Sequence, residues 1–222
     1  MSSNKRSRSS AGSAVSAFRP YTRRVPVSKN VKRYVKNCME RVSEHKYITN
    51  SVSVTPGAAG TSIPAGLYNI LNGTGDSGRV GNVIHVKSLH QRFSFSGTVH
   101  DVVRLILVKD KQCNGALANP VDVLETASIL GCYNTNNVVG HGGDRFVIIS
   151  DQTFTVQPAF SGELTFVEKN KMYTKSVHAD VFYSASTGAV TDLVSTTFTW
   201  ICISSGASTV LNGRMQVEYT DN

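Results

Sequence analysis

From residue 47 onward, short stretches that alternate between polar and apolar residues dominate the chain, and this period of two restricts the fold most. The stretches are rich in Val, Ile, Thr and Phe, which favour strands. Gly, Asn, Asp or Pro separates most of them, and only 121–130 favours a short helix. Strands without alternating helices predict a β-sandwich or barrel rather than an α/β fold. The predicted strands are 47–54, 83–99, 102–109, 145–156, 162–168, 175–184, 196–204 and 214–219.

The positive charge of the chain is concentrated at its N-terminal end. Residues 1–46 hold 12 Lys and Arg against 2 Glu, whereas residues 47–222 hold 11 Lys and Arg against 13 Asp and Glu. Residues 1–27 are rich in Ser, Arg and Lys and poor in apolar residues, so we expect them to be disordered. A basic arm on a near-neutral body indicates a polyanionic partner, either nucleic acid or an anionic membrane surface.

A short amphipathic helix is expected at 28–42. Ser28 is a suitable N-cap, and apolar residues follow it at steps of three and four. These apolar residues are Val31, Tyr34, Val35, Cys38 and Val42. The sequence thus predicts three parts: a disordered arm at 1–27, a basic helix with its linker at 28–46, and a β domain at 47–222.

Ten basic residues of the first two parts are the candidates for nucleic-acid binding. Cations neutralise phosphates and release condensed counterions with little regard for base sequence. Arginine adds bidentate, fork-shaped contacts to phosphate. Two alternatives stay open, namely a solvated tail and a nuclear targeting signal that is compatible with binding. The candidates are Lys5, Arg6, Arg8, Arg19, Arg23, Arg24, Lys29, Lys32, Arg33 and Lys36.

Enzymatic function is not expected, because the sequence has neither a GxSxG elbow nor a P-loop. The histidines lack metal-ligand spacing, and four scattered cysteines favour a reduced, intracellular place of assembly. Asp110, Asp151 and Asp221 lie near predicted strand ends, where calcium between subunits is an option, although roles in turns and caps explain them better. We therefore predict no cofactor. Neither a signal peptide nor a membrane-spanning stretch is expected, so no membrane partner is predicted.

Four segments, taken in order, resemble a known family. They are the Arg-rich start with its basic helix, GDSGRVGNVIHVKSL at 75–89, VVRLILVKDKQCNG at 102–115 and DRFVIISDQTFTV at 144–156. Together they resemble the single-jelly-roll capsid proteins of small circular single-stranded DNA viruses that encode a replication initiator. Those proteins are similar in fold to the satellite tobacco necrosis virus coat protein and, more distantly, to geminivirus coat proteins.

The resemblance implies an all-β fold, an eight-stranded antiparallel viral jelly roll that carries a basic N-terminal arm and a short helix. It also implies self-assembly into an icosahedral T=1 shell of roughly 60 copies. The arm would contact packaged single-stranded DNA, and the protein would occur in the virion and in the host nucleus, with an unknown host receptor. Two alternatives stay open: a satellite-type coat protein that packages single-stranded RNA, and a cellular lectin-like β-sandwich with a basic tail.

Overall fold

The computed structural model describes residues 28–42, 44–113, 115–157, 169–206 and 208–221. They form two units, which divide at residue 42. The arm predicted at 1–27 and the strand predicted at 162–168 lie outside the described residues.

The first unit contains the predicted helix, α1 (Lys29–Val42). Ser28 caps it, since the Val31 backbone N–H donates to Ser28 Oγ at 3.3 Å and the Lys32 N–H donates to the Ser28 carbonyl at 3.1 Å. The predicted helix and its N-cap are therefore confirmed.

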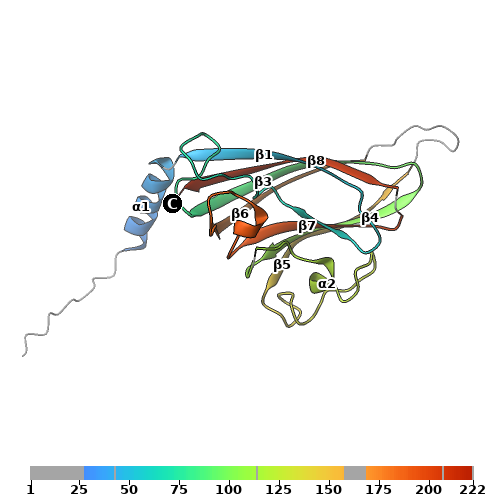
Figure 1. Cartoon of the computed structure of the whole chain (residues 1–222). Helices are drawn as coiled ribbons and strands as arrows, with labels where there is room; N and C mark the ends of the chain where they lie inside the picture. Colours follow the sequence, from blue (N-terminus) through green and yellow to red (C-terminus); the bar gives the residue numbers. More distant parts are fainter. Residues whose placement is uncertain (1–27, 43, 114, 158–168, 207, 222) are drawn as a thin grey trace, which may run out of the picture. The chain divides into compact units, whose positions relative to one another are not determined.

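The second unit contains two antiparallel four-stranded sheets that face each other as layers (Figure 1). The first sheet has the strand order β1-β8-β3-β6 and the second has the order β2-β7-β4-β5. Each strand thus pairs with partners from distant parts of the sequence, which is the connectivity of a jelly roll, and the predicted all-β fold is confirmed. The strands are β1 (His45–Val54), β2 (Thr61–Pro64), β3 (Val83–Ser96), β4 (Asp101–Asp110), β5 (Phe146–Val156), β6 (Lys169–Phe182), β7 (Thr197–Ser204) and β8 (Val210–Asp221).

The main core lies between the sheets, where the alternation of each strand places its apolar side chains. Trp200 of β7 packs edge-on against Phe93 of β3 and Tyr173 of β6, with ring centroids 5.4 and 5.1 Å apart. A second apolar cluster covers the other face of the second sheet, where the long segment between β4 and β5 packs on Ile106 and Ile201. Among the described residues, the second sheet is therefore buried on both faces and the first sheet on one.

Several elements differ from the sequence prediction, among them one strand and two short helices. The strand β2 was not predicted, because four residues that end in proline give little periodic signal. The helix predicted at 121–130 is one turn long, α2 (Pro120–Val123), because Leu124 is extended and bridges to Tyr133. A further short 3-10 helix spans Val190–Asp192.

The first strand begins at His45 rather than at residue 47. Lys46 is buried there, and its ammonium lies 2.8 Å from Asp221 Oδ2 and 2.9 Å from the carbonyl of Gly78. This ion pair extends the ladder between β1 and β8, and the hydrogen bond with Asp221 raises the pKa of Lys46. The sequence prediction assigned Lys46 to the linker that precedes this strand.

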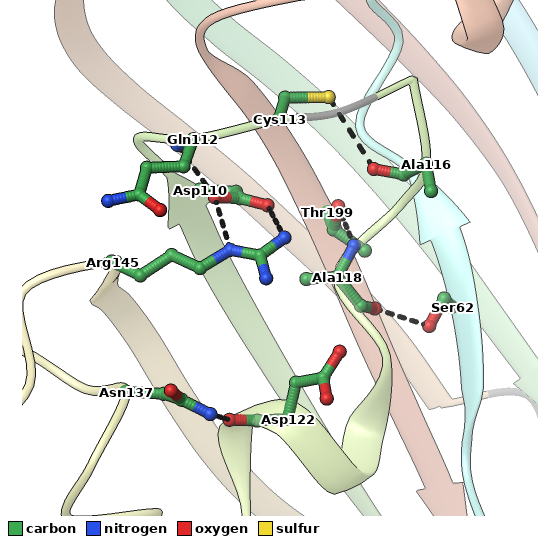
Figure 2. Close-up of polar contacts among 10 residues, drawn as sticks. All are labelled: Ser62, Asp110, Gln112, Cys113, Ala116, Ala118, Asp122, Asn137, Arg145 and Thr199. Atoms are coloured by element: carbon green, nitrogen blue, oxygen red, sulfur yellow. Dashed lines mark hydrogen bonds and ion pairs between the residues drawn. The ribbon is translucent and has the colours of Figure 1, made fainter.

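The segment between β4 and β5 is fixed by polar contacts at both ends (Figure 2). Arg145 donates from Nε and Nη2 to the two carboxylate oxygens of Asp110, at 3.1 and 2.9 Å. Asp110 is fully buried and also accepts the Gln112 N–H. Further along, Ser62 of β2 donates to the Ala118 carbonyl at 2.6 Å. These contacts hold the segment against the second sheet.

Asp101 fixes the connection between β7 and β8 in a similar way. Its buried carboxylate accepts hydrogen bonds from the hydroxyls of Ser204, Ser205 and Thr209 and from the Gly206 N–H. Burial opposes the ionisation of Asp101, but these hydrogen bonds outweigh it and lower the pKa to about 2.

We predict that Asp101→Asn destabilises the free subunit by about 2 kcal/mol at pH 7. The pKa of Asp101 is depressed on folding from about 3.8 to about 2, so its contribution is present above pH 4 and is lost as pH falls through 2. Urea unfolding at several pH values should show the difference between wild type and variant shrinking below pH 4. An unchanged difference from pH 7 to pH 2 would contradict this account, and Asp76→Asn, at an exposed turn, is the control.

We also predict that Arg145→Gln costs about 3 kcal/mol, because it leaves the buried Asp110 carboxylate without its counter-charge. The double variant Asp110→Asn, Arg145→Gln should recover part of this loss, since it removes the charge together with its partner. Urea unfolding of both variants at pH 7 tests the pair. Equal losses in the single and double variants would contradict the predicted recovery.

Candidate nucleic-acid interface

Four of the five basic residues of α1 fall on one side of the helix by its periodicity, and Arg41 is the exception. Lys29, Lys32 and Arg33 occupy successive three- and four-residue steps, and all three are exposed. Lys36 takes the next position of the same stripe along the backbone. The first helical turn contains no acidic residue. This arrangement gives a row of cations that can follow a sugar–phosphate backbone.

The apolar residues of α1 lie on the opposite side of the helix from this basic row. Within their own unit Val31, Tyr34 and Val35 are exposed, Tyr34 by 71%. Cys38 is half-buried. A helix of 14 residues with an uncovered apolar side is marginal by itself and gains stability from packing on protein.

Six of the ten predicted nucleic-acid-binding residues lie outside the described residues, and nothing is said of their structure. They are Lys5, Arg6, Arg8, Arg19, Arg23 and Arg24. The structure places Lys29, Lys32 and Arg33 together on α1, with Lys36 in the same stripe.

Two further arginines were not among the predicted site residues. Arg92 of β3 and Arg214 of β8 are directly opposite each other in the first sheet, and both are exposed on its outer face. Alternation with the buried Phe93 indicates that Arg92 points away from the core. The sequence could not indicate that Arg214 lies beside it, because that requires the strand order and the register.

Two histidines of the first sheet have carboxylate partners that the sequence did not reveal. His45 Nδ1 lies 2.9 Å from Glu218, and His85 Nδ1 lies 2.7 Å from Asp180. A hydrogen bond from Ser88 and the contact with His45 lower the pKa of Glu218, although burial opposes them. These pairs link neighbouring strands, and in the described part of the chain no group of three or more His, Cys, Asp or Glu is placed to hold a metal ion.

The three carboxylates considered for calcium are all engaged by cationic side chains of the same chain. Asp110 pairs with Arg145, and Asp221 pairs with Lys46. The third, Asp151, accepts from Nε and Nη2 of Arg104 at 3.0 and 2.6 Å. Because a guanidinium or ammonium already balances each carboxylate, their evident role is to hold strands and loops together.

The buried cysteines are poor nucleophiles. Burial raises the pKa of the Cys202 thiol to about 12 and also raises that of Cys113. Both are free thiols, as are Cys38 and Cys132. Cys202 of β7 is fully buried in the main core, where a free thiol packs as a small apolar group. Of the helices in the described residues, none is both long and apolar enough to cross a bilayer.

One comparison with known proteins identifies the family. No curated protein matches the chain. The family model described as satellite tobacco necrosis virus coat protein matches residues 20–222, which include α1 and every strand of both sheets. This match supports a viral jelly-roll coat protein and does not support the resemblance to circular DNA viruses and geminiviruses in particular. The chain therefore belongs to the satellite tobacco necrosis virus coat protein family.

Proposed function

We propose that this protein is a structural capsid protein whose copies assemble into a closed shell and whose basic N-terminal region binds the packaged nucleic acid. The observation that carries the proposal is the charge asymmetry, with 12 Lys and Arg in residues 1–46 and a slight acidic excess in the remainder. The family match supports the same role. Its mechanism is assembly rather than catalysis.

The helix α1 suits the boundary between protein and nucleic acid. Its basic row of Lys29, Lys32 and Arg33 offers cations to phosphates, and its apolar side with Val31 and Val35 offers a surface for packing on protein. In a shell that apolar side would pack on the inner wall or on helices of neighbouring subunits around a symmetry axis. Packing and nucleic-acid binding would then stabilise the helix together.

The shell that we propose contains roughly 60 copies, the number that identical contacts give in the smallest icosahedron. Closed symmetry lets one chain repeat the same set of contacts. In this proposal the protein resides in the virion, with nuclear assembly and a host receptor as further parts of the hypothesis.

The packaged polymer is a single-stranded nucleic acid in this proposal. The resemblance to circular DNA viruses favours DNA, whereas the family match supports the satellite-type alternative, for which we propose single-stranded RNA. Phosphate contacts from the arm do not discriminate between the two. Nucleic acid is extracted from particles and treated with DNase or with RNase, and the enzyme that digests it identifies the polymer. A lectin-like module receives no support from the family match.

We predict that Lys29→Gln, Lys32→Gln, Arg33→Gln weakens the binding of single-stranded oligonucleotides by the full-length protein. Removal of three phosphate contacts should reduce the slope of log affinity against log salt by about two. The control Lys109→Gln, Lys111→Gln, Lys175→Gln removes the same charge from the β domain and should leave the slope unchanged. Equal slopes in the wild type and the helix variant would reject the role of the helix.

A second prediction concerns the apolar side of α1. Val35→Asp places a charge in the apolar stripe that packs during assembly. Where this site becomes buried, desolvation of the carboxylate costs about 2–4 kcal/mol per subunit. Particle yield should therefore fall, while circular dichroism of the free subunit stays that of the β-fold. Particles of normal yield, nucleic-acid content and thermal stability would show that this side of the helix is not packed.

A further inference from the structure

Polar side chains line the outer face of the first sheet, and among the described residues no apolar cluster covers it, in contrast to the outer face of the second sheet. Strand alternation brings rows of side chains to the outer face of the first sheet, each row crossing β1, β8, β3 and β6. The row of Tyr47, Glu218, Ser88 and Ser176 carries a carboxylate, and Glu218 contacts His45 and Ser88. The next three rows hold twelve residues, none of them acidic. We call these twelve residues the open face. The rows are Ser53, Asn212, Ser94, Asn170; Ser51, Arg214, Arg92, Met172; and Thr49, Gln216, His90, Thr174.

The charge on the open face is all of one sign. Arg92 and Arg214 lie at the centre of its middle row, and none of its twelve residues is acidic. Among the described residues neither guanidinium has a hydrogen-bond or ion-pair partner, in contrast to Arg104 and Arg145, which each hold an aspartate. Two like charges directly opposite each other in a sheet are destabilising, so the fold alone gives no reason for this pair.

The open face is also hollowed. A groove of about 1000 Å³ runs along it, with Ser51, Arg92, Asn170, Met172, Asn212 and Arg214 in its lining. A smaller hollow of about 420 Å³ continues from the same arginines to Thr49, His90 and Gln216. Neutral hydroxyl and amide donors therefore surround the two guanidinium groups on both sides.

We propose that Arg92 and Arg214 form a phosphate-binding site for single-stranded nucleic acid, separate from the N-terminal arm. Residues directly opposite in a sheet have Cβ atoms roughly 5 Å apart, so both guanidinium groups can reach one phosphate or two consecutive ones. Each can donate in a bidentate manner, and a bound phosphate removes their mutual repulsion. The Ser, Asn and Gln side chains donate further hydrogen bonds to phosphate and sugar oxygens.

Nucleic acid fits this site better than other polyanions. Met172 is 74% exposed beside Arg92 and offers an apolar surface on which a base can lie. Lys171 also lines the groove, but its ammonium lies over the Phe154 ring, so the two arginines are the cations that the open face presents. A strand whose bases also need contacts suits two arginines beside an apolar side chain. The inference rests on the proposed function only in assuming that the protein meets nucleic acid.

The test uses Arg92→Gln, Arg214→Gln in the full-length protein, with a 20-nucleotide oligo(U) and oligo(dT) as probes. The slope of log affinity against log salt should fall by about 1.4, the value for two phosphate contacts on a single strand. Lys109→Gln, Lys111→Gln is the charge-matched control and should leave the slope unchanged. Because the variant removes a like-charge pair, its melting temperature should equal or exceed that of the wild type.

Photo-cross-linking with thio-substituted oligonucleotides locates the contact. Cross-links to peptides that contain Met172 or Arg214, lost in the double variant, support the site, whereas cross-links confined to residues 1–42 overturn it. Loss of heparin binding with unchanged oligonucleotide binding also overturns it, in favour of a polysaccharide site. Groove cross-links that persist in Lys29→Gln, Lys32→Gln, Arg33→Gln, with unchanged affinity, would reject the role of the helix and keep the groove.

Discussion

The two four-stranded sheets pack on each other through one shared core, and this packing determines which faces of the β unit remain for other contacts. Each sheet also has an outer face, which points away from this core, and the two outer faces differ in what covers them. The segment between β4 and β5 covers that of the second sheet with apolar side chains. The outer face of the first sheet stays polar and open, with Arg92 and Arg214 at its centre. Among the described residues, the basic helix and the open face are the two surfaces that we propose for phosphate contacts.

The arginines whose side chains the structure describes fall into two groups that have opposite surroundings. Arg79 is fully buried, donates to the carbonyls of Ile70, Gly81 and Ala185, and lies with its guanidinium 4.3 Å from the Tyr183 ring centroid. Such buried arginines join loops to strands. Exposed arginines on α1 and on the open face lie beside neutral or basic neighbours, which is the environment that binds an anion.

The sequence predicted those elements that have local causes. Alternation of Val, Ile and Thr against polar residues identified seven of the eight strands in the described residues, and the cap at Ser28 identified the start of α1. Two segments of the family resemblance, 102–115 and 144–156, prove to be joined by the pairs Asp110–Arg145 and Arg104–Asp151. Their proximity depends on the pairing of β4 with β5, which has no local signal. The same is true of Arg92 and Arg214, whose pairing arises from strands more than 100 residues apart.

The central claim is that this chain builds a closed shell around nucleic acid by means of its basic N-terminal region. Electron microscopy of the full-length protein expressed alone, together with the ratio of absorbance at 260 and 280 nm of the same fractions, tests it most directly. The account predicts uniform closed shells that contain nucleic acid. Monomers or small oligomers free of nucleic acid at every protein concentration and salt condition would contradict it.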